Sequence, residues 1–271
     1  MNNEISDIEV NKIIEFIDAN YFFNLSNYCR VLITRRLQYI LVKHNLISVD
    51  LLITKLRNNP SFIDIFIANL LIETTELFRE PKVWIAISEK VIPLLISEFG
   101  YVNIWIADCA SGEDYYSLMI LLNDKFSYLP INILVTSPSE YSLCKIKSGE
   151  IHQKKLTLSE KNLKELDPNK SIQDYFKIKY CKNYFNSPHT ISTTFKRLNI
   201  LTDILPNNIN LLLYRNRFQM FNQQLQDLII SKLTKSLMQK CIIIPGIWEN
   251  IENKKIEIFD KTENIYQIKN R

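Results

Sequence analysis

Three polar segments of the chain carry side chains that could bind a small charged ligand. The first, residues 73–81, contains Arg79; the second, residues 107–117, contains Glu113; the third, residues 214–216, ends in an arginine and an asparagine. A guanidinium presents a planar fork of N–H donors that suits a carboxylate, and a carboxylate is a natural partner for an amino group. These residue types can bind a charged ligand, although the same types also form structural ion pairs and solvated strand ends.

The apolar pattern predicts that two of these segments follow buried strands. Four short runs rich in β-branched or aliphatic residues read as strands: residues 102–106, 131–136, 210–214 and 241–244. Helical patterns occupy residues 116–122, 140–147 and 223–238. Strands and helices that alternate in this way are typical of a parallel sheet with helical crossovers. Ligands of such sheets bind at the carboxyl ends of the strands, where the polar turns begin.

The rest of the chain divides into a helical region and an insertion. Apolar residues recur at helical spacing near the N-terminus, so we expect residues 1–80 to form an all-helical domain. Residues 81–271 then form an α/β domain, and we expect a helix near residues 82–99 to act as the hinge. Residues 151–198 fit neither pattern, and we interpret them as an insertion that adds a small antiparallel β unit.

Composition excludes several classes of protein. The chain has four glycines in 271 residues, and they are too far apart to form a glycine-rich phosphate loop. Its five cysteines are widely spaced and have no histidine at ligand spacing, so we expect no metal site and a reducing, cytoplasmic compartment. The net charge of +4 is spread along the chain, which predicts no nucleic-acid partner. We expect no membrane insertion, because there is no signal peptide and no apolar run of about 20 residues.

Five motifs follow one another along the chain. They are ETTELFREP at 73–81, WIADCASGEDYYS at 105–117, KSGEI at 147–151, NLLLYRNRFQMF at 210–221 and PGIWE at 245–249. In this order and spacing the set resembles the CheR-type chemotaxis receptor methyltransferases. The corresponding family patterns are N-x-T-x-F-F-R-[DE], W-S-A-x-[CA]-S-T-G-E-E-P-Y-S, x-S-G-x-Y, D-L-I-x-C-R-N-V-x-I-Y-F and L-G-H-S-E. The resemblance covers almost the whole chain.

The resemblance implies a helical domain followed by a Rossmann-like methyltransferase domain that uses S-adenosylmethionine (SAM). The implied activity is transfer of a methyl group, without metal, to glutamate side chains of a chemoreceptor-like protein by direct displacement. The implied partner is the cytoplasmic region of a chemoreceptor, and we expect a monomer. Carried over residue by residue, the match makes Arg79 the catalytic residue near the reacting methyl. It assigns the binding of SAM, or of its product S-adenosylhomocysteine (SAH), to Thr75, Arg79, Glu113, Asn199, Arg215 and Asn216.

The chain departs from the family at positions that bear on catalysis. Ser137 replaces the acidic residue that would accept hydrogen bonds from ribose hydroxyls. Met220 replaces a tyrosine near the transferred methyl, and Glu73 replaces an asparagine. Asp108 stands where the family has a small residue. These departures leave an alternative open, in which a degenerate member of the same fold holds SAM, SAH or no ligand and acts through protein contacts.

Overall fold

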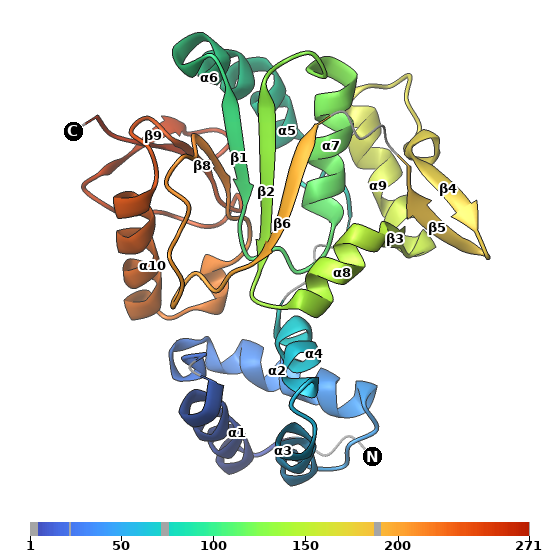
Figure 1. The fold of residues 1–271 in the computed structure, drawn as a ribbon, viewed down its shortest axis with the longest axis vertical. Coiled ribbons are helices and arrows are strands. Elements are labelled where there is room, and N and C mark those ends of the chain that lie inside the picture. Colours follow the sequence, from blue (N-terminus) through green and yellow to red (C-terminus); the bar gives the residue numbers. More distant parts are fainter. Residues whose placement is uncertain (1–4, 22, 72–75, 187–190, 271) are drawn as a thin grey trace.

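The structure is a computed structural model of the chain, and it describes residues 5–21, 23–71, 76–186 and 191–270. A group of helices at the N-terminus lies against one end of a larger α/β unit (Figure 1). Among the described residues, no helix is both long and apolar enough to cross a bilayer. The fold is that of an N-terminal helical domain, a Rossmann-like mixed sheet and a small antiparallel sheet.

The N-terminal helices enclose a hydrophobic core of their own. They are α1 (Asp7–Tyr21), η1 (Leu25–Asn27), α2 (Arg30–Lys43), α3 (Val49–Asn58) and α4 (Phe62–Leu70). Their apolar faces meet in one cluster that includes Ile13, Leu37 and Phe66. Ser48 begins α3 as a sequence pattern predicts, because its side chain accepts a hydrogen bond from the Leu51 N–H at 3.3 Å.

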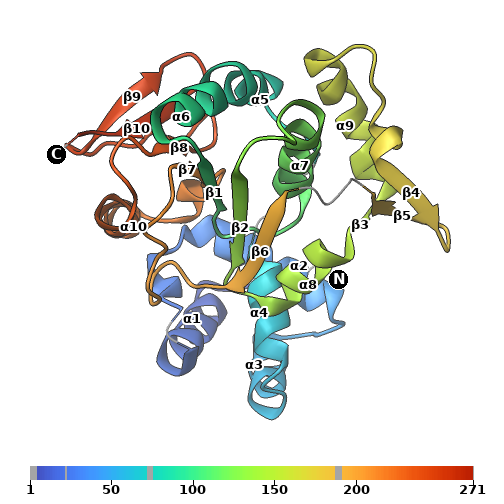
Figure 2. The ribbon, with the colours of Figure 1, turned by 45° about the horizontal axis from the view of Figure 1, so that its top comes forward.

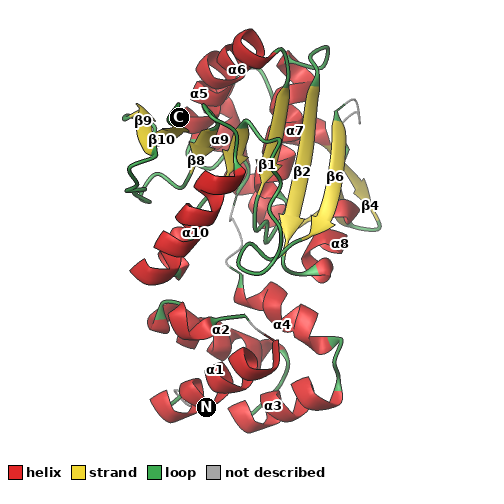
Figure 3. Cartoon of the chain, turned by 60° about the vertical axis from the view of Figure 1, so that its left-hand side comes forward, coloured by secondary structure: helices red, strands yellow, loops and turns green. Residues whose placement is uncertain are grey.

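The main sheet has seven strands in the order β6-β2-β1-β7-β8-β10-β9. They are β1 (Val102–Ile106), β2 (Ile131–Ser137), β6 (Ser192–Arg197), β7 (Leu211–Leu213), β8 (Ile242–Ile244), β9 (Ile256–Asp260) and β10 (Ile265–Ile268). All neighbours are parallel except β10, which runs antiparallel to β8 and β9. The carboxyl ends of β2 and β6 point toward the N-terminal helices (Figure 3).

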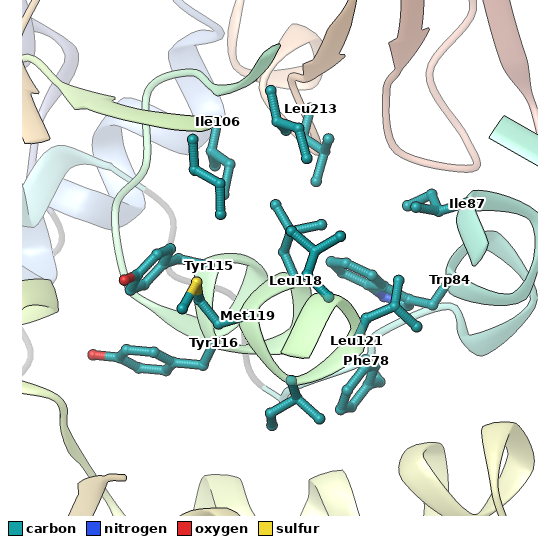
Figure 4. Packing of buried hydrophobic residues seen from close by; sticks show 14 of the residues in the cluster. Phe78, Trp84, Ile87, Ile106, Tyr115, Tyr116, Leu118, Met119, Leu121 and Leu213 are labelled. Atoms are coloured by element: carbon teal, nitrogen blue, oxygen red, sulfur yellow. The ribbon is translucent and has the colours of Figure 1, made fainter. Parts of the chain in front are cut away.

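Helices cover both faces of this sheet. They are α5 (Pro81–Ala86), a π-helical segment η2 (Ile87–Val91), α6 (Ile92–Phe99), α7 (Glu113–Lys125), α8 (Glu140–Ser148) and α10 (Gln223–Ser236). Successive residues of β1 alternate between two clusters: Ile106 belongs to the core with α5 and α7, and Trp105 to the core with α10. Leu118 of α7 lies between the sheet residues Ile106 and Leu213 and the ring of Trp84 (Figure 4).

The helical segment expected at residues 82–99 is confirmed, but its expected role as a hinge is wrong. Val83, Trp84 and Ile87 belong to the same core cluster as β1, so this segment is an integral layer of the α/β unit. The physical reason is that apolar residues recur along one side of this segment. Burying that side against the sheet removes it from water, so the segment packs as part of the α/β unit.

The insertion is shorter than its sequence pattern predicts. Its small sheet has the order β3-β5-β4, from β3 (Glu150–Ile151), β5 (Lys182–Phe185) and β4 (Phe176–Lys179). α9 (Gln153–Leu166) and η3 (Ile172–Tyr175) come between β3 and β4 in the chain, and the small sheet lies to the side of the main sheet (Figure 2). Residues 192–197, expected in this unit, instead form β6 and pair in parallel with β2. Only Thr193 and Phe195 of β6 are partly buried, which is the pattern of a strand at a sheet edge.

Backbone hydrogen bonds and one side-chain cap join the N-terminal helices to the carboxyl edge of the sheet. The Cys29 N–H donates to the Met220 carbonyl at 2.7 Å, and the Asn222 N–H donates to the Asn27 carbonyl at 2.9 Å. The carboxylate of Asp64 on α4 accepts from the N–H groups of Glu140 at 3.0 Å and Tyr141 at 2.6 Å. Asp64 therefore caps α8 from the other domain, and the cap holds the helical domain over the strand ends.

Candidate functional site

The turns that follow β1, β2 and β7 meet at the carboxyl edge of the sheet. The Ala107 N–H donates to the Leu213 carbonyl at 3.0 Å, and the Cys109 N–H donates to the Thr136 carbonyl at 2.7 Å. Gly112 then begins α7, and a Cβ at this position would lie 2.3 Å from the Tyr116 ring. The turn after β1 therefore has little freedom, and it sets Glu113 and Asp114 at the first turn of α7.

Arg215 is the most enclosed of the predicted site residues. Its side chain is 1% exposed, and its guanidinium lies 2.8 Å from Glu80 and 3.1 Å from Asp114. Nη2 also donates to the Arg79 carbonyl at 2.8 Å, while Nε is buried with no hydrogen-bond partner among the described residues. Two carboxylates already balance this cation, so only its Nε edge is left for a further acceptor.

Arg79 has its backbone held and its side chain partly exposed. The Arg79 carbonyl accepts from Trp84 Nε1 at 3.0 Å as well as from Arg215. Its guanidinium Nε lies 3.9 Å from Glu80 Oε1, and a third of the side chain is open to solvent. The structure therefore brings Arg79 and Arg215 together through a main-chain contact and leaves the Arg79 fork available to a carboxylate.

Glu113 is buried and paired with a residue of the insertion. Lys155 Nζ on α9 lies 2.5 Å from Glu113 Oε1, and Oε2 has no hydrogen-bond partner among the described residues. Burial raises the pKa of the Glu113 carboxyl, and the Lys155 ammonium opposes that rise. Arg79 and Glu113 do not form an ion pair with each other, because Glu113 takes Lys155 as its ion-pair partner and Arg79 lies nearest Glu80.

The three remaining predicted residues have different surroundings. Asn199 uses its side chain locally, since Oδ1 accepts from the Leu201 N–H at 3.0 Å. Asn216 has a left-handed backbone with φ of 56°, and its N–H donates to Glu249 Oε2 at 2.8 Å. Thr75 lies outside the described residues. Of the predicted set, the structure thus brings Arg215 into contact with Arg79, while Asn216 is the next residue in the chain and Glu113 is next to the Asp114 that pairs with Arg215.

Asn199 instead borders a different part of the edge, together with residues that replace family positions. It lines a small void with Asp108 and Met220, and Met220 is buried there among apolar side chains. Ser137 is fully buried at the end of β2. Its hydroxyl accepts from the Ser139 N–H at 3.4 Å, and its backbone carbonyl accepts from the Leu198 N–H at 2.9 Å.

Sequence reasoning missed one residue of this site, Arg217. Its side chain is buried, and it lines both the void beside Asn199 and a second void beside Arg215. Burial raises the pKa of the Asp108 carboxyl above its ordinary value. The positive charge of Arg217 opposes part of that rise. The signal was present in the sequence, because the family pattern D-L-I-x-C-R-N-V has valine where this chain has Arg217.

The fold is that of a Rossmann-like α/β protein, a class in which ligands bind where the parallel strands end. The family described as "CheR methyltransferase, SAM binding domain" matches residues 73–266, and "CheR methyltransferase, all-alpha domain" matches residues 8–71. The chain belongs to the CheR methyltransferase family. It is a CheR-like SAM-dependent methyltransferase.

Several relatives share this length and order. A Pseudomonas putida protein named Cher3 is 26% identical over 91% of this chain and 90% of its own. A "Chemotaxis protein methyltransferase" of Borreliella burgdorferi is 25% identical over 95% of this chain and 93% of its own, and one of Listeria monocytogenes is 25% identical over 91% of each. Among solved structures, the rRNA methyltransferase aviRa from Streptomyces viridochromogenes is 10% identical over 68% of this chain and 83% of its own, with a TM-score of 0.40. That last likeness is too low to support a conclusion.

The polar groups of the edge suit SAM, whereas the void beside Arg215 is too small to hold it in this conformation. SAM carries an ammonium and a carboxylate, and the buried Glu113 Oε2 and Arg215 Nε are an acceptor and a donor without protein partners among the described residues. The void beside Arg215 and the void beside Asn199 measure about 10 Å³ each, which is room for one water molecule, and a pocket of about 330 Å³ lined by Pro138, Arg197 and Asn199 adjoins the second. Within the described part of the chain, no three His, Cys, Asp or Glu side chains are placed to hold a metal ion.

Proposed function

We propose that this chain transfers a methyl group from SAM to a glutamate side chain of a chemoreceptor-like protein. One observation carries the proposal: Arg215 Nε is a buried donor without a partner among the described residues, and the Arg215 guanidinium contacts Arg79 within the segment that the SAM-binding family model matches. A polar ligand would supply the missing acceptor, because buried polar atoms are nearly always hydrogen-bonded.

The proposed cofactor contacts follow from the charges. The Glu113 carboxylate receives the SAM ammonium, and the Arg215 Nε donates toward the SAM carboxylate. Thr75, Asn199 and Asn216 are proposed as further contacts on the strength of the family match alone. The cofactor supplies a methyl group on a positively charged sulfur, and its transfer to a carboxylate oxygen leaves a methyl ester and SAH.

Arg79 is proposed to hold the substrate glutamate. Its guanidinium is one-third exposed beside the edge of the sheet, so a carboxylate of another protein can approach it from solvent. A glutamate is ionised at neutral pH and needs no general base, so the role of Arg79 is to orient the nucleophilic oxygen. The proposed methyl acceptor is a carboxylate on the cytoplasmic region of a chemoreceptor. We propose that the methyltransferase itself acts as a monomer in the cytoplasm.

A second candidate function is favoured by the small volume of the voids. Asp108, Met220 and Arg217 stand where the family has a small residue, a tyrosine and a valine, and the void that these three side chains line measures about 10 Å³. In this alternative the chain is a non-catalytic member of the family that acts through protein contacts.

Methyl transfer to a chemoreceptor cytoplasmic fragment separates the two candidates. We expect base-labile methyl groups, released as methanol, from the native chain, and at least about a hundredfold less from Arg79→Ala. Lys82→Ala is the matched control, because Lys82 is exposed on the neighbouring helix α5. Unchanged transfer in Arg79→Ala would contradict the role of Arg79, and no transfer by the native chain at high SAM concentration would leave the non-catalytic candidate.

A further inference from the structure

Arg217 lines two small voids at the carboxyl edge of the sheet. The first void is bordered by Asp108, Asn199 and Met220, and the second by Ser111, Asp114 and Arg215. Arg217 borders both, and it is 6% exposed. Pockets for ligands of drug or cofactor size span roughly 300–1,000 Å³, so two voids of about 10 Å³ each are too small for SAM.

Asp108 is the second side chain that fills this space. It has a φ of 50°, a left-handed backbone that is strained for a residue with a Cβ, and its Oδ2 accepts from the Tyr214 hydroxyl at 3.0 Å. Tyr28 of the helical domain is partly buried on the same void, where burial and the Asp108 charge raise the pKa of its hydroxyl and the Arg217 charge lowers it. The strained backbone and the buried charge both cost stability, so the surrounding contacts must hold Asp108 in place.

We propose that Arg217 and Asp108 form a plug that closes the cofactor site of this chain and weakens its binding of SAM and SAH. The inference rests on the proposed function, which names the ligand. A ligand that bridges Asn199 and Arg215 fits only when the Arg217 side chain leaves the space between the two voids, and that movement takes a buried guanidinium away from the Asp108 carboxylate. Removal of the bulk of Arg217 joins the voids and removes this barrier.

Calorimetric titration with SAH tests the plug in the full-length protein. We expect the native chain to bind weakly, and Arg217→Val, or Arg217→Val with Asp108→Gly, to bind at least about tenfold more tightly. Arg217→Met is the matched control, because it removes the charge and keeps the length. If bulk closes the site, this variant binds as weakly as the native chain. Native binding as tight as that of Arg217→Val would overturn the plug.

A second readout does not need SAM chemistry. Cys109 is buried and borders the void beside Arg215, so opening the plug exposes its thiol. In a background where the exposed Cys144 and Cys181 are serine, a small thiol reagent should label Cys109 at least about tenfold faster in Arg217→Val than in the parent. Asp108→Gly provides the same test if Arg217→Val fails to fold, as judged by circular dichroism.

The two readouts distinguish the plug from the proposed function. Faster labelling of Cys109 without any SAH binding supports the plug and contradicts the use of SAM. Unchanged labelling in a folded Arg217→Val variant overturns the plug, whatever the methyl-transfer assay shows.

Discussion

The ion pair between Lys155 and Glu113 offers the sharpest test of how the site is held together. Lys155 Nζ lies 2.5 Å from Glu113 Oε1, with the glutamate side chain 3% exposed and the lysine side chain 22% exposed. The substitution Lys155→Met removes the ammonium and keeps most of the aliphatic stem. It leaves Glu113 as a buried carboxyl without its cation, and it does so without touching the sheet.

The size of the effect follows from burial. Removing one partner of a buried ion pair costs about 3–5 kcal/mol of unfolding free energy, and the partial exposure of Lys155 puts the expected loss near about 3 kcal/mol. For a chain of this length such a loss lowers the melting temperature by roughly 6–10 °C. Thermal and urea unfolding, followed by circular dichroism, measure both quantities.

The loss should also depend on pH, with a sign that the pKa of Glu113 sets. Burial raises the pKa of this carboxyl above its ordinary value of 4.5, and without Lys155 the pKa rises further. Between the unfolded and the raised folded pKa, the folded state binds more protons, so the free energy of unfolding falls as the pH rises. The deficit of Lys155→Met is therefore smaller at roughly pH 5 than at roughly pH 8.

A surface pair on the same helix is the matched control. Lys164 lies 3.4 Å from Glu160 and is 56% exposed, so Lys164→Met should cost no more than about 0.5 kcal/mol. The double variant Lys155→Met with Glu113→Gln should recover most of the loss, because no buried charge is left. The reasoning is refuted if Lys155→Met costs no more than the Lys164 control or if its deficit grows on acidification.

Two further predictions concern the frame of the site. Asp64→Ala removes the cap that Asp64 places on α8 from the helical domain, so urea unfolding should show a loss of about 1–2 kcal/mol, with wild-type stability counting against the cap. Gly246→Ala would place a Cβ 2.4 Å from Asn216 Oδ1, so it should displace the Asn216 side chain and cost about 1–3 kcal/mol in the same assay. A stability equal to that of the native chain would show that the Asn216 loop gives way freely.

The alternation of strands and helices was predictable because each element is defined by neighbours in the chain. The four predicted strands lie within a residue or two of β1, β2, β7 and β8, and α7, α8 and α10 follow their turns. Residues 192–197 were assigned to the wrong sheet, because a short strand with one half-buried face reads alike in a small antiparallel unit and at the edge of a large parallel sheet.

The candidate site was predictable in part. The motifs located Arg79, Glu113, Arg215 and Asn216 at turns that the sheet does bring to one edge. The partners of these residues were not predictable, since Lys155 lies 42 residues from Glu113 and Arg215 lies 135 residues from Glu80. Such pairs depend on how α9 and α5 pack against the strand ends.

The sequence by itself determined the family, the strand–turn–helix order and the positions of the polar turns, because hydrophobic period and motif spacing are local properties of the chain. Only the tertiary structure decided what occupies the space between those turns. Asp108 and Arg217 are 109 residues apart in the sequence, and they face one space because β1 and β7 are neighbours in the sheet. Whether the edge of this sheet is open to a ligand therefore depends on packing between distant segments.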